Sequence, residues 1–229
     1  MLEAFAEEVW IATGEPCDVA GFSYPTRSVV VRLSNGALWV WSPSTLTDAL
    51  RDALAKLGPV AHLVAPNSFH HLSMGAWQQA FPDAQTYGTA TLIAKRSDLR
   101  WDHPLDNGPA PTWVDEIAVQ VVVNKLTTEA VFFHRKSGTV LVTDLLQQFD
   151  KGFHRGWRSL VARLDLMTGE RPQVPRKFRL GFSNRKRARA EIAPILDWPA
   201  DNLIVAHGAP VLGGAYQVLR QSFRWLMGR

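Results

Sequence analysis

The sequence predicts an α+β protein, an αββα sandwich in which two mixed β-sheets pack face to face and helices cover the outer faces. Three observations predict this fold class: early strand patterns that pair as hairpins, a middle stretch in which strands alternate with helices, and a later strand-rich stretch followed by helices and one last strand. A doubly wound fold would alternate its elements more regularly. The chain also lacks a Gly-x-Gly-x-x-Gly segment after a strand and a Walker-type phosphate loop.

The elements follow in order from turn and periodicity signals. Two β-rich runs flank Asn35-Gly36, and Asn-Gly supplies the positive φ that a tight hairpin turn needs. Leucines then recur at helical spacing over residues 46–57, with Ser44 or Thr45 as the expected N-cap and Gly58-Pro59 as the stop. The later predicted strands are 60–65, 85–88, 117–123, 130–133, 139–143 and 202–206. The later predicted helices are 74–81, 157–166, 186–196 and 216–227, and residues 95–113 are predicted to be an irregular connection.

Length and composition indicate a single globular domain over residues 1–229. The chain has 46% hydrophobic and 20% charged residues, which is enough apolar material for a substantial core. The single cysteine, Cys17, excludes an internal disulfide and a cysteine-based zinc site. The acidic N-terminus does not resemble a secretory signal, and no apolar stretch approaches the ~18–20 residues of a membrane span. We therefore expect a cytoplasmic protein with no membrane partner.

The charge distribution gives little support for nucleic-acid binding. The net charge is +4, and much of the basic excess lies in residues 176–189 and 220–229. The run 184–189 is typical of a solvated helix face. A phosphate-binding or nucleic-acid patch is the alternative, which no accompanying motif or aromatic platform supports. The role of this basic segment stays open, and so does the oligomeric state.

Three separated segments each end an apolar run on a polar residue, and they carry the candidate site. The segments are 63–71, 140–144 and 203–208, and each is typical of a buried strand with a His or Asp where the strand gives way to a loop. If the three loops meet at one edge of the fold, they bring together His70, His71, Asp144 and His207. Imidazole nitrogens and carboxylate oxygens are common ligands of divalent metals, so these residues form a candidate metal site.

In this order, the segments resemble the motifs of the metallo-β-lactamase fold superfamily, most closely a bacterial subgroup of unknown function. The family's first motif is His-x-His-x-Asp-His after a strand, and this chain has Pro-Asn-Ser-Phe-His-His at residues 66–71. His71 matches the last His of that motif, and His70 stands where its Asp belongs. Thr143-Asp144 keeps the Asp of the family's Gly-Asp motif, and His207-Gly208 keeps the late His-Gly motif. The resemblance spans roughly residues 5–228.

The departures from the family pattern imply half of a two-metal site. The resemblance gives the first metal three His ligands, whereas here Pro66 and Ser68 replace two of them and residues 124–127 offer no His in place of the third. It gives the second metal the positions that hold His70, His71, Asp144 and His207 in this chain. Three imidazoles and one carboxylate would suit one Zn, Fe or Mn ion, and an ion with an open position could activate water for hydrolysis.

Two interpretations of this set stay open. Adjacent residues on an extended backbone point in opposite directions, so His70 and His71 converge only if the loop turns between them. The first interpretation is a single-metal hydrolase acting on a small-molecule ester, thioester or phosphoester. The second is a metal-free polar cluster in a non-catalytic protein that binds a small molecule or a protein partner. Glu129 and Asp150 are candidate acids behind the ligands.

Overall fold

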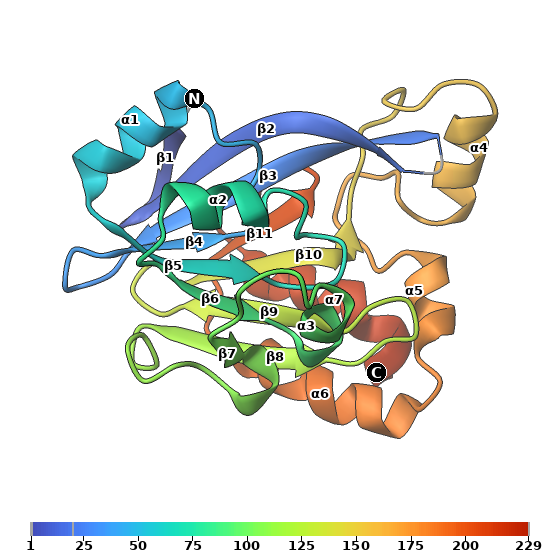
Figure 1. Ribbon diagram of the computed structural model, residues 1–229. Helices are drawn as coiled ribbons and strands as arrows, with labels where there is room; N and C mark the ends of the chain where they lie inside the picture. Colours follow the sequence, from blue (N-terminus) through green and yellow to red (C-terminus); the bar gives the residue numbers. More distant parts are fainter. Residues whose placement is uncertain (1, 20, 229) are drawn as a thin grey trace.

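The strands of the computed structural model form two mixed sheets, and the structure describes residues 2–19 and 21–228 (Figure 1). The first sheet contains, in spatial order, β1 (Leu2–Ala6), β2 (Val9–Val19), β3 (Phe22–Arg32), β4 (Leu38–Trp41), β5 (Val60–Ala65), β6 (Gln85–Gly88) and β7 (His103–Pro104). The second contains β11 (Asn202–His207), β10 (Thr139–Gln147), β9 (Glu129–His134) and β8 (Ile117–Val122). In the first sheet β1 to β4 pair antiparallel and β4 to β7 parallel. In the second sheet only the β10–β11 pair is parallel among the described strands.

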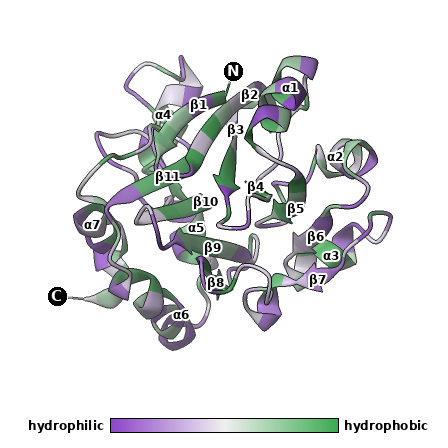
Figure 2. Ribbon diagram, turned by 90° about the vertical axis from the view of Figure 1, so that its left-hand side faces the viewer, coloured by the Kyte–Doolittle hydropathy of each residue, from purple (hydrophilic) through white to green (hydrophobic). Residues whose placement is uncertain are grey.

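Helices cover the outer face of each sheet, which confirms the predicted αββα arrangement (Figure 2). The first sheet is covered by α1 (Asp48–Leu57), α2 (Met74–Ala80) and α3 (Ala90–Lys95). The second is covered by α5 (Arg176–Gly181), α6 (Arg185–Asp197) and α7 (Ala215–Met227). A separate helix, α4 (Trp157–Leu164), lies near the far ends of β2 and β3 (Figure 1). Within the described residues, no helix is both long and apolar enough to cross a membrane.

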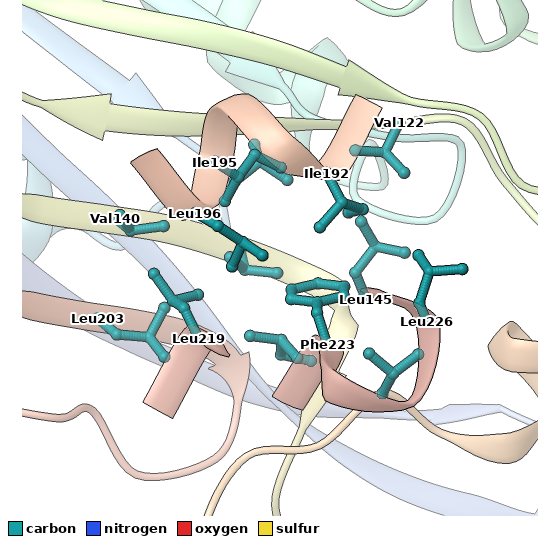
Figure 3. Close-up of a cluster of buried hydrophobic side chains, with 14 of the residues drawn as sticks. Val122, Val140, Leu145, Ile192, Ile195, Leu196, Leu203, Leu219, Phe223 and Leu226 are labelled. Carbon is teal, nitrogen blue, oxygen red and sulfur yellow. The ribbon is translucent and has the colours of Figure 1, made fainter. Parts of the chain in front are cut away.

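Three apolar layers hold these elements together. Between the sheets, the ring of Trp39 meets Trp113 and Phe132 edge to face, with ring centroids 5.9 and 5.1 Å apart. A second layer lies under α1 and α2, where Leu54 and Trp77 are buried. A third layer joins β10 and β11 to α6 and α7 (Figure 3). Burial of each large apolar side chain stabilises the fold by about 1.5–3 kcal/mol, so the sheets are fixed relative to each other and can hold a site at their edge.

Most predicted elements are present, and the differences have local causes. The hairpin turn is confirmed, with Gly36 at φ +83°. Helix α1 is capped by Thr47, whose Oγ1 accepts a hydrogen bond from the Leu50 N–H, and the predicted caps Ser44 and Thr45 are wrong because the helix begins only at Asp48. The segment 95–113 is not wholly irregular, because it contains β7 and the short 3₁₀ helix Leu105–Asn107. The sequence did not predict β1, β2, α3 and α5, because their residues show no clear hydrophobic periodicity.

We expect the layer under α7 to be sensitive to truncation. Leu219 is 1% exposed and packs in the layer drawn in Figure 3. The substitution Leu219→Ala should lower the free energy of unfolding by about 2–5 kcal/mol, because it removes buried methyl groups and leaves a cavity. Leu180→Ala is the matched control, since Leu180 is 83% exposed, and it should change stability by no more than about 0.5 kcal/mol. Equal losses in urea unfolding would contradict this packing.

Candidate metal centre

Three of the four predicted ligands lie together in a buried group. Among the described residues, one set of His, Cys, Asp or Glu side chains offers at least three ligand atoms that all lie within 4.8 Å of one another, and it consists of His70, Asp144 and His207. His70 Nε2 lies 3.3 Å from Asp144 Oδ2. His207 Nε2 lies 3.5 Å from Asp144 Oδ1. The side chains come from the loop after β5, from β10 and from the end of β11.

The side chain of Asn67 shapes the loop that carries His70. Its Oδ1 accepts hydrogen bonds from the N–H groups of Phe69 and His70, at 2.8 and 3.1 Å. Such local bonds let an Asn side chain replace a backbone turn. Its Nδ2 donates to Asp144 Oδ2 at 2.7 Å and to Thr143 Oγ1 at 2.9 Å. The buried amide of Asn67 therefore joins this loop to β10 and sets the direction in which His70 leaves the backbone.

His71 does not join the group. Its Nδ1 lies 2.8 Å from a guanidinium nitrogen of Arg96, and Arg96 is itself paired with Asp98 at 2.7 Å. A guanidinium can only donate, so Nδ1 of His71 is the acceptor. Burial, with the nearby charges of Lys95 and Arg96, lowers the pKa of His71. His70 and His71 lie in a turn rather than on an extended backbone, and their rings still diverge, because Arg96 takes up the ring of His71.

The Nδ1 atoms of His70 and His207, which face away from Asp144, have hydrogen-bond partners of their own. His207 Nδ1 lies 2.9 Å from the backbone oxygen of Pro25, which can only accept, so Nδ1 carries a proton. His70 Nδ1 lies 2.8 Å from Ser42 Oγ, which can donate or accept. Metal-binding imidazoles are commonly fixed in this way through the nitrogen that does not face the metal. Both Nε2 atoms are thereby left to face Asp144.

Ser42 holds His70 from a rare backbone conformation. Its φ is +51°, in the left-handed region that residues other than glycine seldom adopt. The buried backbone of Ser42 is fixed on both sides, because its N–H donates to Val64 and its carbonyl accepts from the Ser28 hydroxyl. Strain of this kind persists only where neighbours hold it, and it gathers at functional sites.

Asp144 lies inside β10 rather than at the end of the strand, which corrects the predicted boundary at Thr143. The register of β10 against β11 shifts between Val142 and Gln147, so this part of the strand is irregular. The buried carboxylate of Glu129 takes over as acceptor there. It accepts the N–H groups of Thr143, Asp144 and Leu145 at 2.7, 2.9 and 3.1 Å. Gln147 Nε2 donates to Asp144 Oδ1 at 3.3 Å and helps to orient it.

Burial and charge set the protonation of these groups. Burial lowers the pKa of His70, and the nearby Asp144 offsets only part of this effect, so the neutral ring is favoured. Burial alone would raise the pKa of Asp144, but His70 and His207 hold it well below its usual range. Burial and the Asp144 charge raise the pKa of Glu129 to about 7. A neutral imidazole and an ionised carboxylate are the forms that bind metals.

A cavity of about 330 Å³ opens onto the three side chains. His70, Asp144 and His207 form part of its wall. Much of the remaining lining is apolar and includes Val19, Phe69, Leu72, Leu126 and Phe178. Lys177 brings a positive charge to the wall, where it is paired with Asp165 at 3.4 Å. A cavity of this size fits a small molecule with an apolar part.

Ser68, which stands at one of the motif His positions in the family resemblance, is paired with the hydroxyl of Thr127. Ser68 Oγ lies 2.9 Å from Thr127 Oγ1, and the Ser68 N–H donates to the same oxygen at 3.2 Å. Ser68 stands for a motif His, and Thr127 belongs to the segment that offers no His. Two hydroxyls bonded to each other are poor zinc ligands compared with imidazole.

A family model described as "Domain of unknown function (DUF4336)" matches residues 7–155, which is more than half of the chain. The chain belongs to this family. The matched part of this DUF4336 protein includes His70 and Asp144, whereas His207 lies beyond it. No match was found among curated protein sequences.

Solved structures share the fold of this DUF4336 protein. A metallo-β-lactamase from Pontibacter korlensis has a TM-score of 0.62 and 13% identity, covering 100% of this chain and 99% of its own. One from Hirschia baltica has a TM-score of 0.64 and 11% identity, covering 99% and 97%. The flavodiiron core of Flv1 from Synechocystis sp. has a TM-score of 0.65 and 11% identity, covering 99% and 60%. The chain therefore has the metallo-β-lactamase fold, as the resemblance implied.

Three groups that hold the candidate ligand side chains in place were not predicted from the sequence. Ser42 follows the apolar run 38–41, so the signal that revealed the other segments was present there too. The Pro25 carbonyl carries no sequence signal, because any residue has a backbone oxygen. Gln147 was not considered because the predicted strand ends at residue 143. Of the two candidate acids, Glu129 supports Asp144, while Asp150 accepts a hydrogen bond from Gln148.

We expect Glu129 to make stability depend on pH. An ordinary Glu loses its proton near pH 4.5, whereas the raised pKa keeps it bound in the folded protein to about pH 7. Between these values the folded state binds more protons than the unfolded state, so this contribution falls as pH rises. The stability of the native protein minus that of Glu129→Gln should decline by on the order of 1–3 kcal/mol across this window. Denaturant titrations giving a flat or rising difference would contradict the raised pKa.

Proposed function

We propose that this protein is a single-metal hydrolase whose ligands are His70, Asp144 and His207. The observation that carries the proposal is the orientation of His207. Its Nδ1 proton is committed to the Pro25 carbonyl, so in the neutral ring the Nε2 lone pair faces the Asp144 carboxylate at 3.5 Å. Two acceptors at this distance repel each other unless a cation or a proton lies between them.

The spacing of the ligand atoms favours a metal ion over a direct hydrogen bond. Two ligand atoms each ~2.1 Å from a tetrahedral ion lie about 3.4 Å apart. The nitrogen–oxygen separations to Asp144 are 3.3 Å for His70 and 3.5 Å for His207. A charge-assisted hydrogen bond between these groups would be shorter, about 2.8 Å. Two imidazoles and one carboxylate serve zinc hydrolases and non-haem iron enzymes alike, which supports one Zn, Fe or Mn ion.

The surrounding residues suit hydrolysis of a small molecule. Bound there, the ion would act as a Lewis acid and lower the pKa of a coordinated water. Asn67 and Gln147 fix the Asp144 carboxylate, and Ser42 fixes the His70 ring. The apolar wall would bind the apolar part of a substrate, and Lys177, which is paired with Asp165, places a cation beside the cavity. Esters, thioesters and phosphoesters with an apolar part match this lining.

A metal-free binding protein is the alternative function. If His70 and His207 each carry a proton on Nε2, both can donate to Asp144 without any ion, and the same cavity then binds a small molecule without chemistry. The low pKa of Asp144 supports this state as well as the metal-bound one. Metal content separates the two.

The proposed function makes a prediction about metal content. After chelation and reconstitution with Zn, Fe(II) or Mn(II), plasma mass spectrometry should find about one ion per chain. Asp144→Ala and His207→Ala should abolish this binding. His71→Ala is the matched control and should retain it, because His71 faces Arg96. At metal concentrations about 100-fold above the dissociation constant, the ion should stabilise the native protein by about 2.7 kcal/mol in thermal unfolding.

Two results would reject the metal site. One is a native protein without bound ion after reconstitution with all three metals. The other is equal metal loss in His71→Ala and His207→Ala, which would place the ion elsewhere.

The proposed function also makes a prediction about activity. A panel of 4-nitrophenyl esters, aryl thioesters and aryl phosphodiesters should reveal metal-dependent turnover. Asp144→Asn should lower kcat/KM by at least about 100-fold, because loss of metal removes several kcal/mol of transition-state stabilisation. Asp52→Asn, an exposed change on α1, is the control and should keep the native rate. A metal-loaded protein that is inactive on the whole panel would contradict the proposed hydrolase function.

A further inference from the structure

Helix α4 exposes the face that a helix normally buries. Successive residues of an α-helix lie about 100° apart, so its four large apolar residues share an arc of about 100°. These residues are Trp157, Leu160, Val161 and Leu164, and their exposed fractions are 58, 50, 40 and 54%. The small Ala162 lies on the opposite side of the helix and is the residue of α4 that is buried.

The inner side of α4 is fixed to the β2–β3 hairpin. Ala162 packs in a small cluster with Phe22, Phe149 and Met167. The ring of Phe22 also meets one edge of Trp157, with centroids 5.5 Å apart. Arg158 donates to the backbone oxygen of Gly21. The apolar face is therefore held outward, at the end of the molecule where Figure 1 places α4.

Positive charge surrounds this apolar face. Residues 151–164 contain four basic side chains and no acidic one. The four are exposed: Lys151, Arg155, Arg158 and Arg163. On the helix, Arg158 and Arg163 lie on the two flanks of the apolar arc, each about 110° from its centre. Phe153, 47% exposed, adds an aromatic ring beside the helix.

We propose that α4 docks this protein onto the surface of a membrane that contains anionic lipids. A helix that lies in the interface inserts a Trp- and Leu-bearing face among the acyl chains, while flanking Arg side chains reach back to the headgroups. The charge also argues against a second copy as the occupant, because two such faces would bring eight cations together. The sequence-based expectation of no membrane partner rested on the lack of a spanning segment, and docking on a membrane surface needs none; no described helix is long and apolar enough to span.

Vesicle sedimentation with the full chain tests the proposal. The protein should pellet with vesicles of equal parts phosphatidylcholine and phosphatidylglycerol, and much less with phosphatidylcholine alone. Leu160→Glu should weaken binding at least about ten-fold, because a leucine no longer enters the acyl region. The double variant Arg155→Gln/Arg163→Gln should weaken it about 30-fold, and added salt should weaken the native protein too.

Matched controls carry the same chemical changes elsewhere. Leu180→Glu alters a leucine that is 83% exposed on α5, and Arg185→Gln/Lys186→Gln removes two exposed charges from α6. Both should bind like the native protein. The proposal is overturned by absence of binding to anionic vesicles, or by equal losses in the variants and their controls. A native dimer that Leu160→Glu dissociates in sedimentation velocity would also overturn it, since the face would then be a contact between copies.

Discussion

The amide of Asn67 is the one side chain on which the geometry of the candidate site depends. Its oxygen turns the loop that carries His70, and its nitrogen donates to the carboxylate that both imidazoles face. The same nitrogen lies 3.3 Å from Glu129, which in turn holds the irregular backbone around Asp144. A buried amide has few donors and acceptors, and here both of its ends are used. Its position therefore fixes the loop after β5 relative to β10. As a result, His70 on that loop and Asp144 on β10 keep their separation.

The sequence predicts the strands that carry the site better than it predicts the site. Apolar runs reveal β5, β10 and β11, because a strand buried on both faces has a local signature. Local sequence does not decide which of His70 and His71 faces Asp144. It depends on the turn that Asn67 imposes, and on Arg96, which lies 25 residues further along the chain and takes up His71. The support from Pro25 is less predictable still, because it comes from a backbone oxygen 182 residues away from His207.

Burial decides which polar groups near the cavity need a charged partner. Ser68 and Thr127 satisfy each other through a hydrogen bond between their hydroxyls, so neither needs a further partner. The Asp144 carboxylate is charged and cannot be satisfied by a neutral hydroxyl in this way. Its buried carboxylate needs compensating positive charge, either from a cation or from protonated imidazoles, because an isolated buried charge is strongly destabilising. His70 and His207 thus stay useful to the fold in both interpretations, and their presence alone does not distinguish catalysis from structure.

The β2–β3 hairpin links the cavity to the exposed face of α4. Val19 and Tyr24 line the cavity, while Phe22, two residues before Tyr24, packs beneath α4. Successive side chains of a strand point to opposite faces, so residues 22 and 24 share one face of β3. A shift of α4 on a lipid surface would therefore be transmitted to the cavity wall through this short stretch of backbone. The ring of Tyr24 also meets the ring of His207, with centroids 5.1 Å apart, so this part of β3 contacts both the candidate site and the cluster beneath α4.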